Sequence, residues 1–242
     1  MCKNHSSDMA NSYFKFKQFT VWQDKCAMKV GTDGVLLGSW TDINHAKTIL
    51  DVGTGTGLIA LMLAQRSTAN ITAIEIDKDA YSQATENIKS SPWSNRIEVI
   101  HEDLNRFYPG KKYDLIVSNP PYFIDSLKSP DDSRTVARHN QNLTYRELVC
   151  KVSELLESNG LFSMIVPTSV INHIIAEAHD FNLHPMELTN VITAPGKLPK
   201  RSLISFQFSE KNYIPKELLI EIERHKYSDE FNNLIKDFYL NI

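Results

Sequence analysis

The sequence predicts an α/β fold in which a seven-stranded, mostly parallel sheet carries helices on both faces and ends in an antiparallel C-terminal hairpin. Five short runs of β-branched and other apolar residues alternate with stretches of helical character. Such alternation is typical of a parallel sheet that is buried on both sides. Two further runs near the C-terminus are joined by "PGKLPKR", which leaves no room for a helix, so we expect them to pair antiparallel.

The expected elements follow one another along the chain. Residues 14–22 alternate apolar and polar side chains as a strand or hairpin arm does, and residues 32–40 open with capping residues and continue as a short apolar helix. We then expect strands at 47–52, 70–76, 96–101, 113–119, 161–167, 188–194 and 202–209, and helices at 57–66, 78–90 and 143–158. Residues 216–240 read as a final helix or two. The character of the chain changes near residue 46, which predicts an N-terminal extension, 1–45, and a main domain, 46–242.

Composition excludes several classes of protein. The formal net charge of -3 argues against a globally basic surface, so a polyanionic partner has to be held by a local patch. No apolar run is long enough to span a membrane, and the polar N-terminus lacks the apolar core of a secretory signal. The three cysteines, Cys2, Cys26 and Cys150, have no metal-ligand spacing. We therefore expect a cytoplasmic protein with no membrane partner and no metal site.

The stretch "ILDVGTGTGLIALMLA" is the strongest single signal in the chain. Gly53, Gly55 and Gly57 fall between an expected strand and an expected helix, where glycine lets the backbone turn tightly and approach a ligand at the helix N-terminus. The plain alternative is a tight turn that binds nothing. Leu58 stands where a dinucleotide-binding fingerprint needs glycine, and no phosphate-binding lysine follows.

This G-x-G-x-G pattern after Asp51 resembles motif I of the class I S-adenosylmethionine-dependent methyltransferases, whose fold is Rossmann-like. The resemblance implies S-adenosyl-L-methionine as the cofactor. It also implies that Asp51 faces the cofactor's amino group, directly or through water, and that the glycines admit its methionine and ribose parts.

Carboxylates end the next two expected strands. Glu75 lies where such folds use an acid to accept hydrogen bonds from the two ribose hydroxyls. Asp77 is the rival for that role, although it is equally suited to cap the following helix, and we favour Glu75. Asp103, with Leu104 beside it, is expected by the same resemblance to receive the cofactor's adenine. The alternative for Asp103 is a solvated turn carboxylate.

The stretch "VSNPPYF" ends the fourth expected strand. Prolines commonly end strands, but that leaves Asn119 before them and Tyr122 after them unexplained. Asn119, Pro120, Pro121 and Tyr122 match the N-P-P-[YFW] motif of methyltransferases that act on a planar nitrogen. In this interpretation the Asn119 side-chain oxygen and the Pro120 carbonyl accept the two N–H groups of the target amine, so that its lone pair can face the methyl group. Tyr122 offers a face on which a flipped base can stack.

The substrate is indicated by a second resemblance. "FTVWQDKCAMKVGTDGVLLGSW" is similar to the N-terminal signature of the bacterial tRNA1(Val) (adenine(37)-N(6))-methyltransferase family, and the likeness returns at "ARH" and "APGKLPKRSLISF". It implies methyl transfer to the exocyclic 6-amino group of the adenine next to the anticodon in valine tRNA. It also implies that Thr32 and Asp33 help to close the methionine end of the cofactor site, although both would serve equally as a plain helix cap.

Contacts with the tRNA anticodon stem-loop are expected from two basic segments. Lys197, Lys200 and Arg201 lie in a stretch without acidic residues, where a solvated hairpin tip is the alternative. Arg134 and Arg138 lie in the polar loop 123–142, which we expect to close over the site. Alternative functions are methylation of ribosomal RNA adenine or a protein glutamine amide, or a non-catalytic RNA-binding protein that binds the same cofactor. A nicotinamide oxidoreductase is disfavoured by Leu58.

Overall fold

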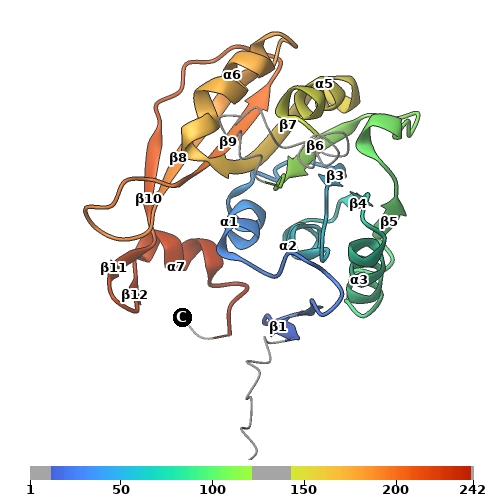
Figure 1. The fold of residues 1–242 in the computed structure, drawn as a ribbon, viewed down its shortest axis with the longest axis horizontal. Helices are drawn as coiled ribbons and strands as arrows, with labels where there is room; N and C mark the ends of the chain where they lie inside the picture. The colour runs from blue at the N-terminus through green and yellow to red at the C-terminus, as the bar shows by residue number, and fades with distance from the viewer. Residues whose placement is uncertain (1–11, 122–142, 241–242) are drawn as a thin grey trace, which may run out of the picture.

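The computed structural model describes residues 12–121 and 143–240 and is built around an eight-stranded sheet in the order β10-β8-β9-β7-β6-β3-β4-β5 (Figure 1). The strands are β3 (Thr48–Val52), β4 (Asn70–Glu75), β5 (Ile97–His101), β6 (Tyr113–Ser118), β7 (Leu156–Pro167), β8 (His184–Ile192), β9 (Arg201–Gln207) and β10 (Lys216–Leu219). All neighbouring strands pair parallel except that β9 is antiparallel to both β7 and β8. The predicted parallel sheet with an antiparallel C-terminal hairpin is thus confirmed.

Strand β10 was not expected, because residues 216–227 were predicted to be helical. They instead form β10 and a small hairpin of β11 (Glu221–Glu223) and β12 (Lys226–Tyr227). Lysine, glutamate and leucine favour helix locally, but pairing with the edge of β8 and burial of Leu218, which is 1% exposed, outweigh that preference. A helix forms only afterwards, as α7 (Asp229–Ile235), which Ser228 caps by accepting from the Phe231 N–H at 3.0 Å.

Helices cover both faces of the sheet (Figure 1). One face carries α1 (Thr32–Trp40), α2 (Leu58–Arg66), α3 (Lys78–Lys89) and α7, and the other carries α5 (Tyr145–Leu155) and α6 (Ile171–His179). The one-turn helices η1 (Leu104–Arg106) and η2 (Thr168–Val170) follow β5 and β7. The strongly apolar runs of β3, β6 and β7 are buried between these two layers, as parallel strands require.

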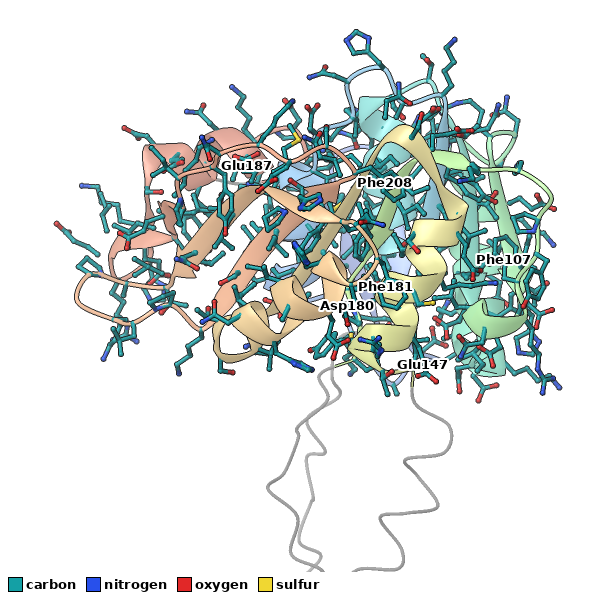
Figure 2. All side chains as sticks on the ribbon, turned by 90° about the horizontal axis from the view of Figure 1, so that it is seen from above. Phe107, Glu147, Asp180, Phe181, Glu187 and Phe208 are labelled. Carbon is teal, nitrogen blue, oxygen red and sulfur yellow. The ribbon has the colours of Figure 1, made fainter. Side chains whose placement is uncertain are left out.

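The two helices on the second face, α5 and α6, are joined by contacts between the start of α5 and the end of α6. Arg146, near the start of α5, donates to Glu177 in α6 and to Asp180 just after it, the latter at 2.7 Å. Its guanidinium also lies over the ring of Phe181, 5.1 Å from the centroid. Figure 2 labels Phe181 and Asp180, which directly follow α6. The sequence left α6 without a prediction, and it placed the end of α5 and the start of β7 too far along the chain. In the structure α5 ends at Leu155 and β7 begins directly at Leu156.

The N-terminal segment belongs to the same core as the rest of the chain. Strands β1 (Tyr13–Lys15) and β2 (Thr20–Trp22) form a complete hairpin where a single strand or hairpin arm was predicted, and Phe16 and Phe19 in its turn stack at 4.6 Å between ring centroids. The Lys17 N–H donates to the Phe238 carbonyl at 2.8 Å, which joins the hairpin to the C-terminal end. Within the described ranges, no helix has the length and apolar character that crossing a membrane demands.

Candidate functional site

The glycine turn lies at the edge of the sheet where the parallel strands end. The Gly53 and Thr54 N–H groups both donate to the Ile74 carbonyl, at 3.0 and 3.1 Å, so the turn is held against the end of β4. Gly53 and Gly55 have φ angles of +70° and +58°, and a Cβ on either would meet nothing within 4 Å. Their backbone therefore borders open space that a ligand can occupy. Gly57 differs, because a Cβ there would lie 3.5 Å from Ala84 of α3.

Asp51 lies beneath this turn and is fully buried. Its Oδ2 accepts hydrogen bonds from the Thr54 hydroxyl at 2.6 Å and the Ala60 N–H at 3.2 Å. Its Oδ1 is buried and has no hydrogen-bond partner in the part of the chain that the structure describes. Burial raises the pKa of Asp51 to about 7, although the bonds from Thr54 and Ala60 oppose the shift. The site thus contains a buried oxygen that can accept a bond from a ligand's ammonium or N–H group.

Glu75 ends β4 beside the turn and is 8% exposed. Its Oε2 accepts from the Gly55 N–H at 2.8 Å, and its Oε1 accepts from the Asp77 N–H at 2.9 Å. The rival carboxylate, Asp77, is the N-cap of α3 and accepts from the Asp79 and Ala80 N–H groups. Helix capping therefore accounts for Asp77 and leaves Glu75 as the carboxylate that contacts the glycine turn.

Asp103 and Leu104 follow β5, one strand further along the same edge. The Glu102 N–H donates to the Glu75 carbonyl at 3.1 Å, which keeps this segment next to the end of β4. The Asp103 side chain is half-buried and caps η1 by accepting from the Asn105 N–H at 2.9 Å. Leu104 is buried, and it can supply an apolar wall beside the carboxylate.

Asn119 comes directly after β6, next to the glycine turn. Ser118 is the register partner of Val52 and donates to its carbonyl at 3.0 Å, so Asn119 follows β6 as Gly53 follows β3. The Oδ1 atom of Asn119 is buried and accepts no hydrogen bond from any residue in 12–121 or 143–240. Pro120 is buried and Pro121 is exposed. The remaining predicted residues of this region, Tyr122, Arg134 and Arg138, lie outside the described residues.

Thr32 and Asp33 begin α1, but neither is its N-cap. Gly31 takes that place without a side-chain cap bond, so the expectation of a plain Thr or Asp cap is wrong. Asp33 instead accepts a charge-assisted hydrogen bond from Arg201, with 2.9 Å between Nε and Oδ2. The start of α1 lies over the start of α2, since a Cβ on Gly34 would be 3.0 Å from Leu58 Cδ2.

The three basic residues predicted for RNA contact lie in and after the turn between β8 and β9. Lys197 and Lys200 are exposed, whereas Arg201 begins β9 and lies against Asp33. The Lys200 carbonyl accepts from the Thr168 N–H at 3.2 Å, so the base of the turn is fixed to the end of β7. The turn therefore emerges at the same edge of the sheet as the glycine turn and Asn119.

Sequence reasoning missed one polar residue that contacts the glycine turn. Asn87 in α3 is 1% exposed, and its Nδ2 donates to the Thr56 carbonyl at 2.8 Å. The available signal was a pair of amides four residues apart, Gln83 and Asn87, on the apolar face of the helix expected at 78–90. Buried amides on such a face have to find specific partners.

Comparison with known proteins relates the chain to methyltransferases. The family model described as "Methyltransferase small domain" matches residues 27–180. A protein of Bacteroides thetaiotaomicron named tRNA1(Val) (adenine(37)-N6)-methyltransferase is 53% identical over 236 residues, covering 97% of this chain and 100% of its own. A protein of Flavobacterium psychrophilum with the same name is 47% identical over 233 residues, covering 95% and 100%.

Solved structures show the likeness of fold alone. A predicted O-methyltransferase of Agrobacterium tumefaciens superposes with a TM-score of 0.69 at 20% identity, covering 87% of this chain and 100% of its own. The glycopeptide N-methyltransferase MtfA in complex with S-adenosylmethionine gives a TM-score of 0.53 at 13% identity, covering 75% and 100%. The sheet described above is therefore that of a class I methyltransferase.

Proposed function

This chain belongs to the tRNA1(Val) (adenine(37)-N6)-methyltransferases, within the methyltransferase small domain family, and on that premise we propose the reaction and the residues that perform it. The enzyme transfers a methyl group from S-adenosyl-L-methionine to the exocyclic 6-amino group of the adenine at position 37, next to the anticodon, in valine tRNA. One observation supports the assignment of this reaction to particular residues. The Oδ1 atom of Asn119, beside the glycine turn, is buried and has no hydrogen-bond partner among the described residues.

The residues at the turn fit the cofactor. The buried Oδ1 of Asp51 suits its amino group, and the open backbone edge at Gly53 and Gly55 has room for its methionine and ribose parts. Glu75 would accept from the ribose hydroxyls, and Asp103 with Leu104 would hold the adenine. When bound, the cofactor supplies a methyl group on a positively charged sulfur. Thr32 and Asp33 are proposed to close the methionine end, from the start of α1.

Asn119 prepares the nitrogen that receives the methyl group. An adenine amine is a poor nucleophile because its lone pair is delocalised into the ring. If the Asn119 side-chain oxygen and the Pro120 carbonyl each accept one of its N–H groups, the nitrogen becomes pyramidal and its lone pair turns out of the ring plane. The fixed φ of Pro120 and Pro121 holds that carbonyl in one direction. Tyr122 is proposed to stack on the flipped base.

The tRNA is proposed to lie along the edge formed by the β8–β9 turn. Lys197 and Lys200 would contact phosphates of the anticodon stem-loop, with Arg201 at their base. Arg134 and Arg138, which lie outside the described residues, are proposed as further phosphate contacts. These contacts position the RNA without reading its sequence, so selection of the adenine is assigned to Asn119 and the residues that follow it. We propose a cytoplasmic location for this reaction, where tRNA is the available substrate.

The test is direct methylation. Purified protein is incubated with isotopically labelled S-adenosylmethionine and total tRNA from a strain that lacks the gene, and nucleosides are then separated by mass spectrometry. We expect labelled N6-methyladenosine in valine tRNA and none in tRNA from the parent strain, where the position is already methylated. Label in a nucleoside other than N6-methyladenosine would overturn the proposed substrate, and the absence of any label would overturn the activity.

A further inference from the structure

The segment from the last residue of β2 to the residue before Gly31, residues 22–30, crosses the outer side of α3 and is named here the strap. It is held by buried amide side chains rather than by regular secondary structure. The Lys25 N–H donates to Gln83 Oε1 at 3.0 Å, and the Val30 N–H donates to Gln23 Oε1 at 2.7 Å. Gln23 and Gln83 are 6% and 1% exposed, so neither amide can exchange these bonds freely for water.

Asn87 makes the contact that relates the strap to the cofactor turn. Its Oδ1 accepts from the Trp22 N–H at 2.9 Å, and its Nδ2 donates to the Trp22 carbonyl and to the Thr56 carbonyl, both at 2.8 Å. Both donor hydrogens of the amide are thereby used. One buried side chain thus fixes the start of the strap and the glycine turn relative to each other.

The course of the strap brings it to the cofactor edge. From Asn87 it runs along α3 toward the start of that helix, passing Gln83, before it reaches the N-terminus of α1. Cys26, midway along, is buried. Beyond the strap, the start of α1 lies over Leu58 at the start of α2, so both ends of the strap are held against the segment that contains the glycine turn.

We propose that the strap is the outer wall of the cofactor site next to the glycine turn, and that Asn87 is the positioning residue that sets the distance between the strap and that turn. The inference rests on the proposed function only for the identity of the cofactor. Asn87 is placed to touch neither cofactor nor tRNA, and it acts through Trp22 and Thr56. Its replacement should therefore change cofactor affinity and leave the tRNA step unaltered once the cofactor is saturating.

Binding of S-adenosylhomocysteine, measured by calorimetry without tRNA, tests this assignment. Asn87→Ala removes all three bonds, and Asn87→Asp retains the acceptor but neither donor. We expect each to raise the Kd by about tenfold, the size of one to two missing hydrogen bonds, with tRNA KM unchanged at saturating cofactor. The matched control is Ser91→Ala, which removes the buried hydroxyl that bonds Ile88 and Trp93 just beyond α3 but does not touch the strap. An unaltered Kd in the Asn87 variants would overturn the role of Asn87, whatever their melting temperatures.

Limited trypsin digestion tests the wall itself, since the strap carries the exposed Lys25 and Lys29. In the wild type, we expect S-adenosylhomocysteine to slow cleavage after these lysines, detected by intact mass, while cleavage after Lys111 at the opposite end of β6 stays unchanged. In Asn87→Ala, cleavage of the strap should be faster without ligand. Equal cleavage of the wild-type strap with and without ligand would overturn the inference. Because the calorimetric Kd and the digestion are both measured without RNA, protection of the strap would stand even if the methylation test found no label in tRNA.

Discussion

Arg201 and Asp33 are 168 positions apart in the chain, yet the Arg201 Nε donates to Asp33 Oδ2 at 2.9 Å. Asp33 begins the helix that lies over the start of α2, and Arg201 begins the strand that follows the exposed turn with Lys197 and Lys200. The two side chains are only 24% and 31% exposed, so the pair is partly shielded from solvent. The ion pair therefore ties the start of α1, which is proposed to close the cofactor site, to the base of the turn proposed to contact RNA.

The first prediction concerns this pair. Arg201→Ala should weaken cofactor binding by about threefold, because a partly exposed pair contributes on the order of 0.5 to 1 kcal/mol. Asp33→Ala should weaken cofactor binding by at least as much. The double variant should bind the cofactor no more weakly than Asp33→Ala does, because the effects of two residues that act through each other are not additive. Calorimetric Kd values for the three variants check this. If Arg201→Ala changed only the tRNA KM and its salt dependence, Arg201 would be a phosphate contact instead.

Asn119 is predicted to act in the methyl-transfer step alone. Asn119→Ala should lower kcat by about 100-fold or more, the usual effect of removing one preorganised hydrogen-bonding group from a transition state, with the cofactor Kd unchanged. Single-turnover rates and calorimetry measure the two quantities separately. The control is Asn105→Ala, which removes an exposed amide at the same edge of the sheet. A fully active Asn119→Ala enzyme would rule out the proposed mechanism.

Gly55 and Gly110 form a matched pair for testing the glycine turn. Both have positive φ, +58° and +67°, and a Cβ on either would meet nothing within 4 Å. Alanine at each should therefore destabilise the fold similarly, by about 1 to 2 kcal/mol for the left-handed conformation. Only Gly55→Ala should also weaken cofactor binding, since its methyl group would enter the space proposed for the ligand. Urea unfolding and cofactor titration of both variants decide the matter, and equal cofactor affinities would show that this space is not used.

The exposed lysines of the β8–β9 turn are predicted to contact phosphates. The double variant Lys197→Ala/Lys200→Ala should raise the tRNA KM, and the slope of log KM against log salt should fall by about 0.7 for each phosphate that is no longer neutralised. The cofactor Kd should not change. Lys111→Ala/Lys112→Ala removes the same charge from the turn before β6, at the opposite edge, and is the control. Indistinguishable salt slopes for the two double variants would show that the turn is a solvated hairpin tip and does not contact phosphates.

Asp51 is predicted to make stability depend on pH. Its pKa is raised by burial to about 7, above the ordinary value for aspartate, so the folded protein holds a proton that the unfolded chain has released between about pH 4 and pH 7. Because the folded state binds more protons there, the free energy of unfolding from this group falls as pH rises through that window and is constant above it. Asp51→Asn should remove this component. Urea unfolding across the window measures the slope for both proteins, and parallel curves would contradict the burial of a titrating Asp51.

The sequence was sufficient for those parts of the site that depend on local spacing. The glycine turn, Glu75 and Asn119 each lie at the end of a buried strand or directly after one, and parallel strands end at one edge, so their proximity follows once the strands are recognised. Contacts between distant segments could not be obtained this way. The Arg201–Asp33 pair and the Asn87 bonds depend on how the ends of the chain pack against its centre, which no local pattern records.

The error at β10 has a related cause. Its four residues would be acceptable in a helix, and only the free edge of β8 makes them a strand. Asp33 shows the same limit at the level of one side chain. Its position near a helix start allowed the alternative of a helix cap. In the structure Gly31 is the N-cap, and the Asp33 carboxylate pairs with Arg201 of β9.

The reversed direction of β9 has a consequence for how such an enzyme can change its substrate. Were β9 parallel to its neighbours, a crossover would be needed and the chain would enter β9 from the far edge of the sheet. Because it is antiparallel, a short turn beside the edge that carries Asn119 and the glycine turn suffices, and that turn exposes Lys197 and Lys200 and is bonded at its base to Thr168. Its length and composition can vary without displacing a strand or the methyl-transfer residues. A differently shaped RNA could therefore be held there after exchange of a few residues and with no added domain, while the residues proposed for methyl transfer stay unchanged.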